Sequence, residues 1–146
     1  MGWSGICRVF GAGSASVDRF LLDSDVIIWN LRGRIETTEM IEGLLADGGG
    51  LLASSALSVM EVWAGVRSGE AEEISALFSS FDVIPVDGVV ARKAAGLLPA
   101  TIRKNPRAWI DTLIAATAIE YGLTLVTYNR RHFDYPGLKV HSAHLS

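Results

Sequence analysis

Short apolar runs and helically spaced apolar positions alternate along the chain from Asp18 onward. Apolar runs at residues 19–22, 51–54, 83–86, 123–127 and 138–140 have the length of short strands, the last at a sheet edge. Between them, apolar residues recur at three- and four-residue intervals, which predicts helices at 26–31, 36–47, 57–66, 70–80, 88–104 and 111–121. A chain that alternates strands and helices forms a mainly parallel sheet covered by helices. The pattern therefore predicts the α/β class.

The first 17 residues carry no such pattern. They are rich in glycine and serine, and Gly11 and Gly13 interrupt their apolar stretch, unlike the continuous apolar region of a secretory signal peptide. We predict a flexible arm at 1–17 followed by a single domain at 18–146, since 146 residues suit one domain. No run reaches the ~18 apolar residues of a membrane span, so no membrane partner is expected.

Composition narrows the class of protein. Hydrophobic residues make up 49% and charged residues 20% of the chain, which excludes a disordered or fibrous protein. Cys7 is the single cysteine, which excludes a disulfide scaffold and a multi-cysteine zinc site and favours a reducing, cytoplasmic location. The formal charge of −3 argues at first against a nucleic-acid partner.

Three acidic residues are associated with the predicted strand ends. Asp23 directly follows the first strand, Glu61 lies in the helix after the second, and Asp111 begins the helix that leads to the strand at 123–127. Functional sites of parallel sheets form beyond the carboxyl ends of the strands. Each acid also has a structural explanation: Asp23 as a helix cap, although Ser24 or Asp25 would serve equally well, Glu61 as a solvated side chain, and Asp111 as a charge at a helix start.

Clustered carboxylates repel one another, and their natural partner is a hard divalent cation. Mg²⁺ takes oxygen ligands and usually keeps several waters, and such a site activates water and stabilises the charge that develops on a phosphodiester. We therefore expect Mg²⁺, with Mn²⁺ as the alternative ion. The three histidines, at 132, 141 and 144, lie near the C-terminus and are not expected to be ligands.

Four segments resemble the PIN-domain family, and within it the VapC-type ribonuclease toxins. They are FLLDSDVIIWNLRG (20–33), SALSVMEVWAGV (55–66), DTLIAATAIEYGLTLVTYNRRHF (111–133) and PGLKV (136–140). The resemblance implies a three-layer α/β/α sandwich and a metal-dependent nuclease whose four-position acidic set falls on Asp23, Glu61, Asp111 and Asn129. Many relatives have Asp at the last position, so Asn129 leaves open whether one metal or two are bound.

The resemblance also assigns supporting residues and partners. Asp25 falls at a position that varies in the family, and we expect it to be a helix cap that also assists the site. The resemblance implies that the Thr127 hydroxyl bonds to a neighbouring acid. It further implies a homodimer held in the cytosol by a VapB-like antitoxin that blocks the site. The free toxin would then cut cellular RNA, either tRNA or rRNA.

The distribution of charge is compatible with an RNA substrate. Without the three proposed ligands, 13 acidic residues remain against 13 basic ones, and the window from Gly88 to Ile110 holds five basic residues and no acid. Basic side chains beside the proposed site are expected to contact phosphates. These candidate substrate-binding residues are Arg103, Lys104, Arg107, Arg130 and Arg131.

The sequence therefore predicts a Mg²⁺-dependent endoribonuclease toxin in which metal-activated water attacks the phosphodiester. Two alternatives remain. The segment LLDSDVI is similar to the opening motif of haloacid-dehalogenase-type phosphatases, but Ile27 stands where that class needs Thr or Val. A catalytically silent RNA- or protein-binding module on the same scaffold is the other alternative, supported by the missing acid at position 129.

Overall fold

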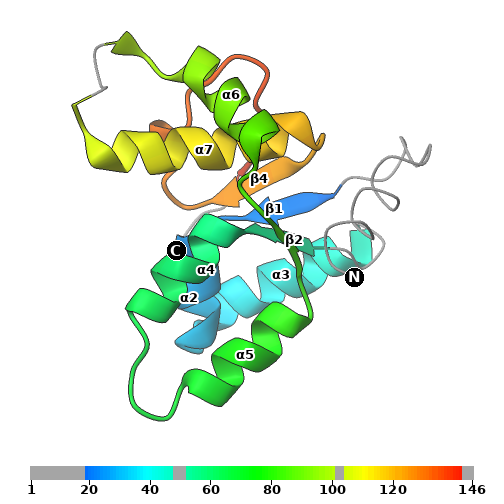
Figure 1. Ribbon diagram of the computed structural model, residues 1–146. Coiled ribbons are helices and arrows are strands. Elements are labelled where there is room, and N and C mark those ends of the chain that lie inside the picture. Colours follow the sequence, from blue (N-terminus) through cyan, green and yellow to red (C-terminus); the bar gives the residue numbers. More distant parts are fainter. Residues whose placement is uncertain (1–18, 48–51, 101–103, 143–146) are drawn as a thin grey trace.

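A sheet of five parallel strands runs through the computed structural model, which describes residues 19–47, 52–100 and 104–142 (Figure 1). The predicted α/β class, with a central parallel sheet between layers of helices, is confirmed. The strands lie in the order β3 (Asp82–Ile84), β2 (Leu52–Ser55), β1 (Phe20–Leu22), β4 (Thr124–Thr127) and β5 (Val140–Ser142).

Helices cover both faces of the sheet, as Figure 1 shows. One face carries α2 (Ser24–Leu31), α3 (Ile35–Asp47), α4 (Ala56–Ala64) and α5 (Ala71–Ser79). The other face carries α7 (Pro106–Glu120), and α6 (Gly88–Leu97) packs against α7. This arrangement is the α/β/α sandwich that the sequence predicted.

The central strand β1 supplies both halves of the core. Leu21 packs with Ile114 and Ala115 of α7 in one buried cluster. Phe20 and Leu22 belong to the cluster on the opposite face. Successive side chains of a strand point to opposite faces of the sheet, so a fully apolar strand such as β1 must be covered by helices on both sides.

Two predicted helix boundaries were wrong. The helix predicted at 88–104 ends at Leu97, and the helix predicted from Asp111 begins at Pro106. Asn105 is the N-cap of α7, and its side chain accepts a hydrogen bond from the Arg107 N–H at 3.1 Å. Asparagine is a favoured cap and proline suits the first helical position, so Asn105–Pro106 starts a helix rather than only ending one.

The predicted boundaries of the C-terminal strand were also wrong. The strand predicted at 138–140 lies at Val140–Ser142, parallel to β4 at the edge of the sheet. A turn precedes it, in which the Leu138 N–H donates to the Tyr135 carbonyl at 3.2 Å.

The predicted arm at 1–17 lies outside the described residues. Within those residues, no helix has the length and apolar character needed to cross a membrane.

Candidate functional site

The carboxyl ends of β1 and β4 meet at one edge of the sheet. Leu22 is in register with Ser54 of β2 and Val126 of β4, and the next residue, Asp23, donates its N–H to the Val126 carbonyl at 2.9 Å. A hollow of about 170 Å³ opens here. The polar side chains around it are those of Asp23, Ser24, Asp25, Glu61, Arg107, Asp111, Asn129 and His132.

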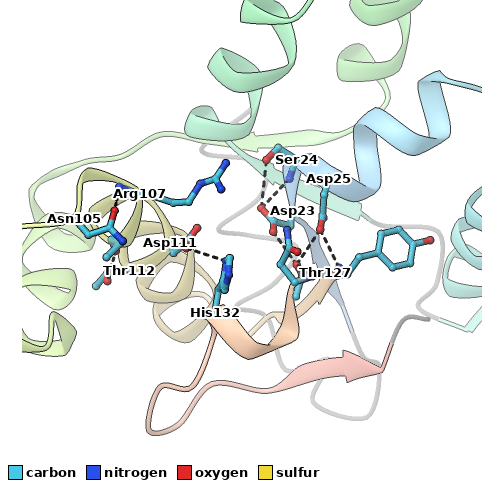
Figure 2. A network of polar contacts seen from close by, with 12 residues as sticks. Asp23, Ser24, Asp25, Asn105, Arg107, Asp111, Thr112, Thr127 and His132 are labelled. Carbon is cyan, nitrogen blue, oxygen red and sulfur yellow. Dashed lines mark hydrogen bonds and ion pairs between the residues drawn. The ribbon is translucent and has the colours of Figure 1, made fainter. Parts of the chain in front are cut away.

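Asp23 is buried and held by hydrogen bonds from two elements (Figure 2). It is the N-cap residue of α2, and its Oδ1 accepts the Ser24 N–H at 2.8 Å. Its Oδ2 accepts the Thr127 hydroxyl at 2.8 Å, from the end of β4. Asp23 therefore has the capping role that Ser24 or Asp25 could have taken, and it lies in the hollow as well.

Asp25 lies in the first turn of α2 rather than at its cap, so the predicted cap position was wrong. The reason is that Asp23, two residues earlier, already occupies the cap. The Asp25 carboxylate accepts the Val26 N–H at 2.7 Å and the Tyr128 N–H at 3.1 Å. These bonds tie the start of α2 to the end of β4, next to the acids.

Glu61 reaches the hollow from the second turn of α4 and contacts Ser24. The Ser24 hydroxyl donates to Glu61 Oε1 at 3.0 Å and lies 3.5 Å from Asp23 Oδ1. From the sequence, Ser24 is expected only as a possible helix cap. The signal that could have identified it is its place directly after an acid at a strand end, where its hydroxyl bridges two carboxylates.

Asp111 faces the hollow from the second turn of α7, because the helix begins at Pro106. The predicted position at a helix start was therefore wrong. Its Oδ2 lies 3.7 Å from Nδ1 of His132 (Figure 2). The sequence predicts no site role for His132, although this residue follows Asn129 by one turn after the end of β4.

The acids of the hollow hold protons more tightly than free carboxyl groups. Burial is the largest cause of the raised pKa of Asp23, Glu61, Asp25 and Asp111. The Asp23 charge raises the other three further, so that the pKa is about 7 for Asp25 and about 6 for Asp111. The hollow thus gathers negative charge that the surrounding protein offsets only in part.

One of the predicted basic residues reaches this hollow. Figure 2 shows Arg107 extending across it from the start of α7, and its charge lowers the pKa of Glu61 and Asp111. Arg131 and Arg130 line neighbouring hollows, and Lys104 is exposed before α7. Arg103 lies outside the described residues.

The donor set suits a hard cation. Four carboxylates, those of Asp23, Asp25, Glu61 and Asp111, line one small hollow together with Asn129, and oxygen donors are what Mg²⁺ prefers. Within the described ranges, no three acidic, histidine or cysteine side chains are already grouped as a metal cluster. Mg²⁺ is usually bound by one or two carboxylates and retains several waters, so these residues fit an ion held partly through water.

Comparison with known proteins gives a consistent picture. The family model described as the PIN domain matches residues 20–138. Ribonuclease VapC10 of Mycobacterium tuberculosis is 39% identical over 114 residues, 77% of this chain and 84% of that protein. Ribonuclease VapC19 of the same organism is 34% identical over 122 residues, 82% of this chain and 96% of that protein.

Several solved structures are similar to this chain in fold. A toxin–antitoxin complex from Klebsiella pneumoniae has a TM-score of 0.63 and 26% identity, covering 81% of this chain and 93% of that one. FitAcB from Neisseria gonorrhoeae has a TM-score of 0.59 and 25% identity, covering 84% and 96%. VapBC2 from Rickettsia felis, bound to a DNA fragment from its promoter, has a TM-score of 0.67 and 20% identity, covering 84% and 97%, which supports the fold alone.

Proposed function

The chain belongs to the PIN-domain family, and from that premise we propose that it is a VapC-type endoribonuclease, the toxin of a toxin–antitoxin pair. Its relatives VapC10 and VapC19 are named as ribonucleases. The observation that carries the proposal is the meeting of Asp23, Glu61 and Asp111 in one hollow. These acids come from three distant segments, and the Asp23 charge raises the pKa of both Glu61 and Asp111.

The proposal includes a divalent cation, Mg²⁺ or alternatively Mn²⁺. Asp23, Glu61 and Asp111 would hold it, directly or through water, and Asn129 would support the site. When bound, a divalent cation supplies water activation and charge stabilisation for phosphodiester hydrolysis. Asn129 keeps an amide oxygen but carries no charge, which favours one ion over two.

The protein's own residues position the acids and the substrate. Thr127 and Ser24 hold Asp23 and Glu61 through hydrogen bonds of 2.8 Å and 3.0 Å, which fixes the carboxylates before RNA arrives. Arg107 lies on the wall of the same hollow and would bind the phosphate, since guanidinium groups match phosphate oxygens in geometry and charge.

Partners and location follow from the same assignment. We propose that the substrate is a cellular RNA, tRNA or rRNA, and that a VapB-like antitoxin covers the site in the inactive complex. The similar structure from Klebsiella pneumoniae, which is described as a toxin–antitoxin complex, supports this partner. A homodimer and a cytoplasmic location complete the proposal, the latter supported by the single cysteine.

Cleavage of structured RNAs by purified Asp111→Asn and Asp23→Ala variants tests the assignment. Loss of a required carboxylate is expected to lower the rate at least about a hundredfold and to relieve growth arrest. Asp82→Asn is the matched control, because Asp82 also has a pKa raised by burial but lies at the amino end of β3, away from the hollow. Retained cleavage in both site variants would contradict the proposal.

A second candidate is a catalytically silent RNA- or protein-binding module. It is favoured by Asn129, which lacks the negative charge of an aspartate at that position. Calorimetric titration with Mn²⁺ separates the two candidates. The nuclease requires binding that is lost in Asp111→Asn, whereas the silent module predicts no binding in either protein.

A further inference from the structure

A second hollow, of about 270 Å³, adjoins the acidic one. The two hollows share three wall residues, Arg107, Asp111 and His132. The remaining walls of this side chamber, as we call it, are Pro99, Asn105, Ala108, Arg131, Asp134 and Tyr135. Its volume is close to the ~300 Å³ at which small-ligand sites begin, so one ligand unit, but not two, fits inside.

The floor of the side chamber is apolar and rigid. Ala108 and Tyr135 are 6% and 8% exposed. The Tyr135 hydroxyl is 2.7 Å from the Thr112 hydroxyl, within the core, so its polar atom is satisfied and its ring is fixed in place. Only a small part of the Tyr135 ring is open to the chamber, so with Ala108 it offers an apolar contact to the edge of an unpaired base.

The rim of the side chamber is polar and carries both signs of charge. Arg107 and Arg131 are exposed, and Arg131 forms no ion pair with any residue that the structure describes. Asp134 is likewise exposed and unpaired within the described ranges. Two cations beside an apolar floor match a phosphate joined to a base, which is the chemistry of a nucleotide.

We propose that the side chamber binds a single nucleotide of the RNA, adjoining the phosphodiester bond that is cut. Its phosphate lies between Arg107 and Arg131, and its base contacts Ala108 and Tyr135. This placement rests on the proposed ribonuclease function, because the shared wall of Arg107, Asp111 and His132 puts the chamber beside the acids.

Asp134 gives the chamber a preference among bases. A carboxylate accepts hydrogen bonds only, so it pairs with bases that present amino groups, such as guanine and cytosine. Uracil offers one N–H between two carbonyl oxygens, which a carboxylate repels. The chamber therefore favours guanosine over uridine.

Nucleotide binding to the full chain tests the proposal, with a chelator present so that a bound cation does not contribute. Guanosine 5′-monophosphate, uridine 5′-monophosphate and inorganic phosphate are titrated separately and followed by NMR of the isotope-labelled protein. We expect the guanosine nucleotide to shift the amide signals of Asn105, Ala108 and Tyr135. We also expect it to bind about fivefold more tightly than the uridine nucleotide.

Three variants isolate the contributions. Asp134→Asn is expected to remove the preference for the guanosine nucleotide. Arg131→Ala is expected to weaken the binding of both nucleotides. Arg92→Ala is the matched control, since this exposed arginine of α6 lies outside the chamber, and it is expected to leave both affinities unchanged. Inorganic phosphate that binds as tightly as the guanosine nucleotide, or a preference that survives in Asp134→Asn, would overturn the proposal.

The outcome is separable from the ribonuclease assignment. The chain could bind the guanosine nucleotide in the chamber and yet cut no RNA. That result would overturn the ribonuclease assignment and leave the side chamber as a nucleotide-binding site. Conversely, a chain that cuts RNA but whose preference at the cut is the same in Asp134→Asn would overturn the chamber and retain the ribonuclease.

Discussion

Asp23 shows how a single buried carboxylate is kept in the fold. It is 6% exposed and accepts hydrogen bonds from the Ser24 N–H and the Thr127 hydroxyl, both at 2.8 Å. These bonds favour the charged form, but burial outweighs them and its pKa remains raised. A buried charge is costly unless it is paired or bound to a metal. The two hydrogen bonds offset only part of the cost of burying the Asp23 charge.

Replacement of Thr127 by valine tests this dependence. The change removes the hydroxyl that donates to Asp23 Oδ2 while keeping the shape of the side chain. We expect the free energy of unfolding at neutral pH to fall by about 1–3 kcal/mol, because a buried acceptor loses its partner. Urea denaturation measures this difference.

Thr117→Val is the matched control. Thr117 is equally buried, but its hydroxyl donates to the Leu113 carbonyl within α7, at 2.8 Å. Because the Leu113 carbonyl lies within a helix, the free energy of unfolding is expected to fall by about 0.5 kcal/mol or less. Equal losses in the two variants would show that the bond to Asp23 has no special weight.

The sequence predicted the acids, and the expected hydrogen bond from Thr127 to a neighbouring acid is confirmed, but the roles of Ser24 and His132 were missed. Asp23 and Glu61 could be placed because a parallel sheet brings its strand ends to one edge. Ser24 and His132 could not, because their contacts with Glu61 and Asp111 depend on side-chain directions across the hollow. Sequence spacing between segments 37 residues apart, such as Ser24 and Glu61, carries no such information.

At the scale of the elements, caps determine where each helix begins and therefore which residues face the hollow. Asn105 starts α7 at Pro106, which puts Asp111 in the second turn. Ser55 starts α4 directly after β2, and its hydroxyl accepts the Leu57 N–H at 3.1 Å. The sequence predicted the existence and order of these helices but misplaced the start of α7, since Asn105–Pro106 suits a break as well as a beginning.

Ser55→Ala and Asp87→Ala compare two caps of similar geometry. Asp87 caps α6, accepting the Val90 N–H at 3.0 Å. Each substitution is expected to lower the free energy of unfolding by about 1 kcal/mol, as measured by urea denaturation. Because α4 carries Glu61 and α6 lines no part of the acidic hollow, we expect only Ser55→Ala to lower RNA cleavage by folded protein. Reduced cleavage in Asp87→Ala would contradict this division.

At the scale of the whole molecule, the negative charge is concentrated where it costs stability. The chain has a net charge of −3, and the acidic hollow at one edge of the sheet gathers four acids with raised pKa. Arg107 offsets part of this charge at Glu61 and Asp111. Net charge was therefore a poor guide to an RNA partner, because the sum does not show where the charges meet.

Stability without metal is expected to fall as the pH rises. The pKa of Asp111 moves from 3.8 to about 6 and that of Asp25 from 3.8 to about 7 on folding. In this range the folded chain binds more protons than the unfolded chain, so raising the pH favours unfolding. Melting in the presence of chelator is expected at a temperature about 5 °C lower at neutral pH than near pH 4.

A divalent cation and a site variant complete the pH test. Mg²⁺ is expected to recover stability at neutral pH, where the acids are charged, and to have little effect near the lower end of the range. Asp111→Asn is expected to flatten the pH dependence, because it removes one of the shifted groups. A melting temperature that rises steadily with pH in chelator would contradict the account.

RNA cleavage by the purified chain, with and without chelator, decides whether the protein is a metal-dependent ribonuclease. A panel of structured RNAs is incubated with the protein alone, with chelator, and with chelator followed by excess Mg²⁺ or Mn²⁺, beside Asp111→Asn as the inactive reference. The account predicts cleavage that stops with chelator and returns with either ion, and that is absent in Asp111→Asn. Cleavage that persists in chelator, or equals that of Asp111→Asn, would contradict it.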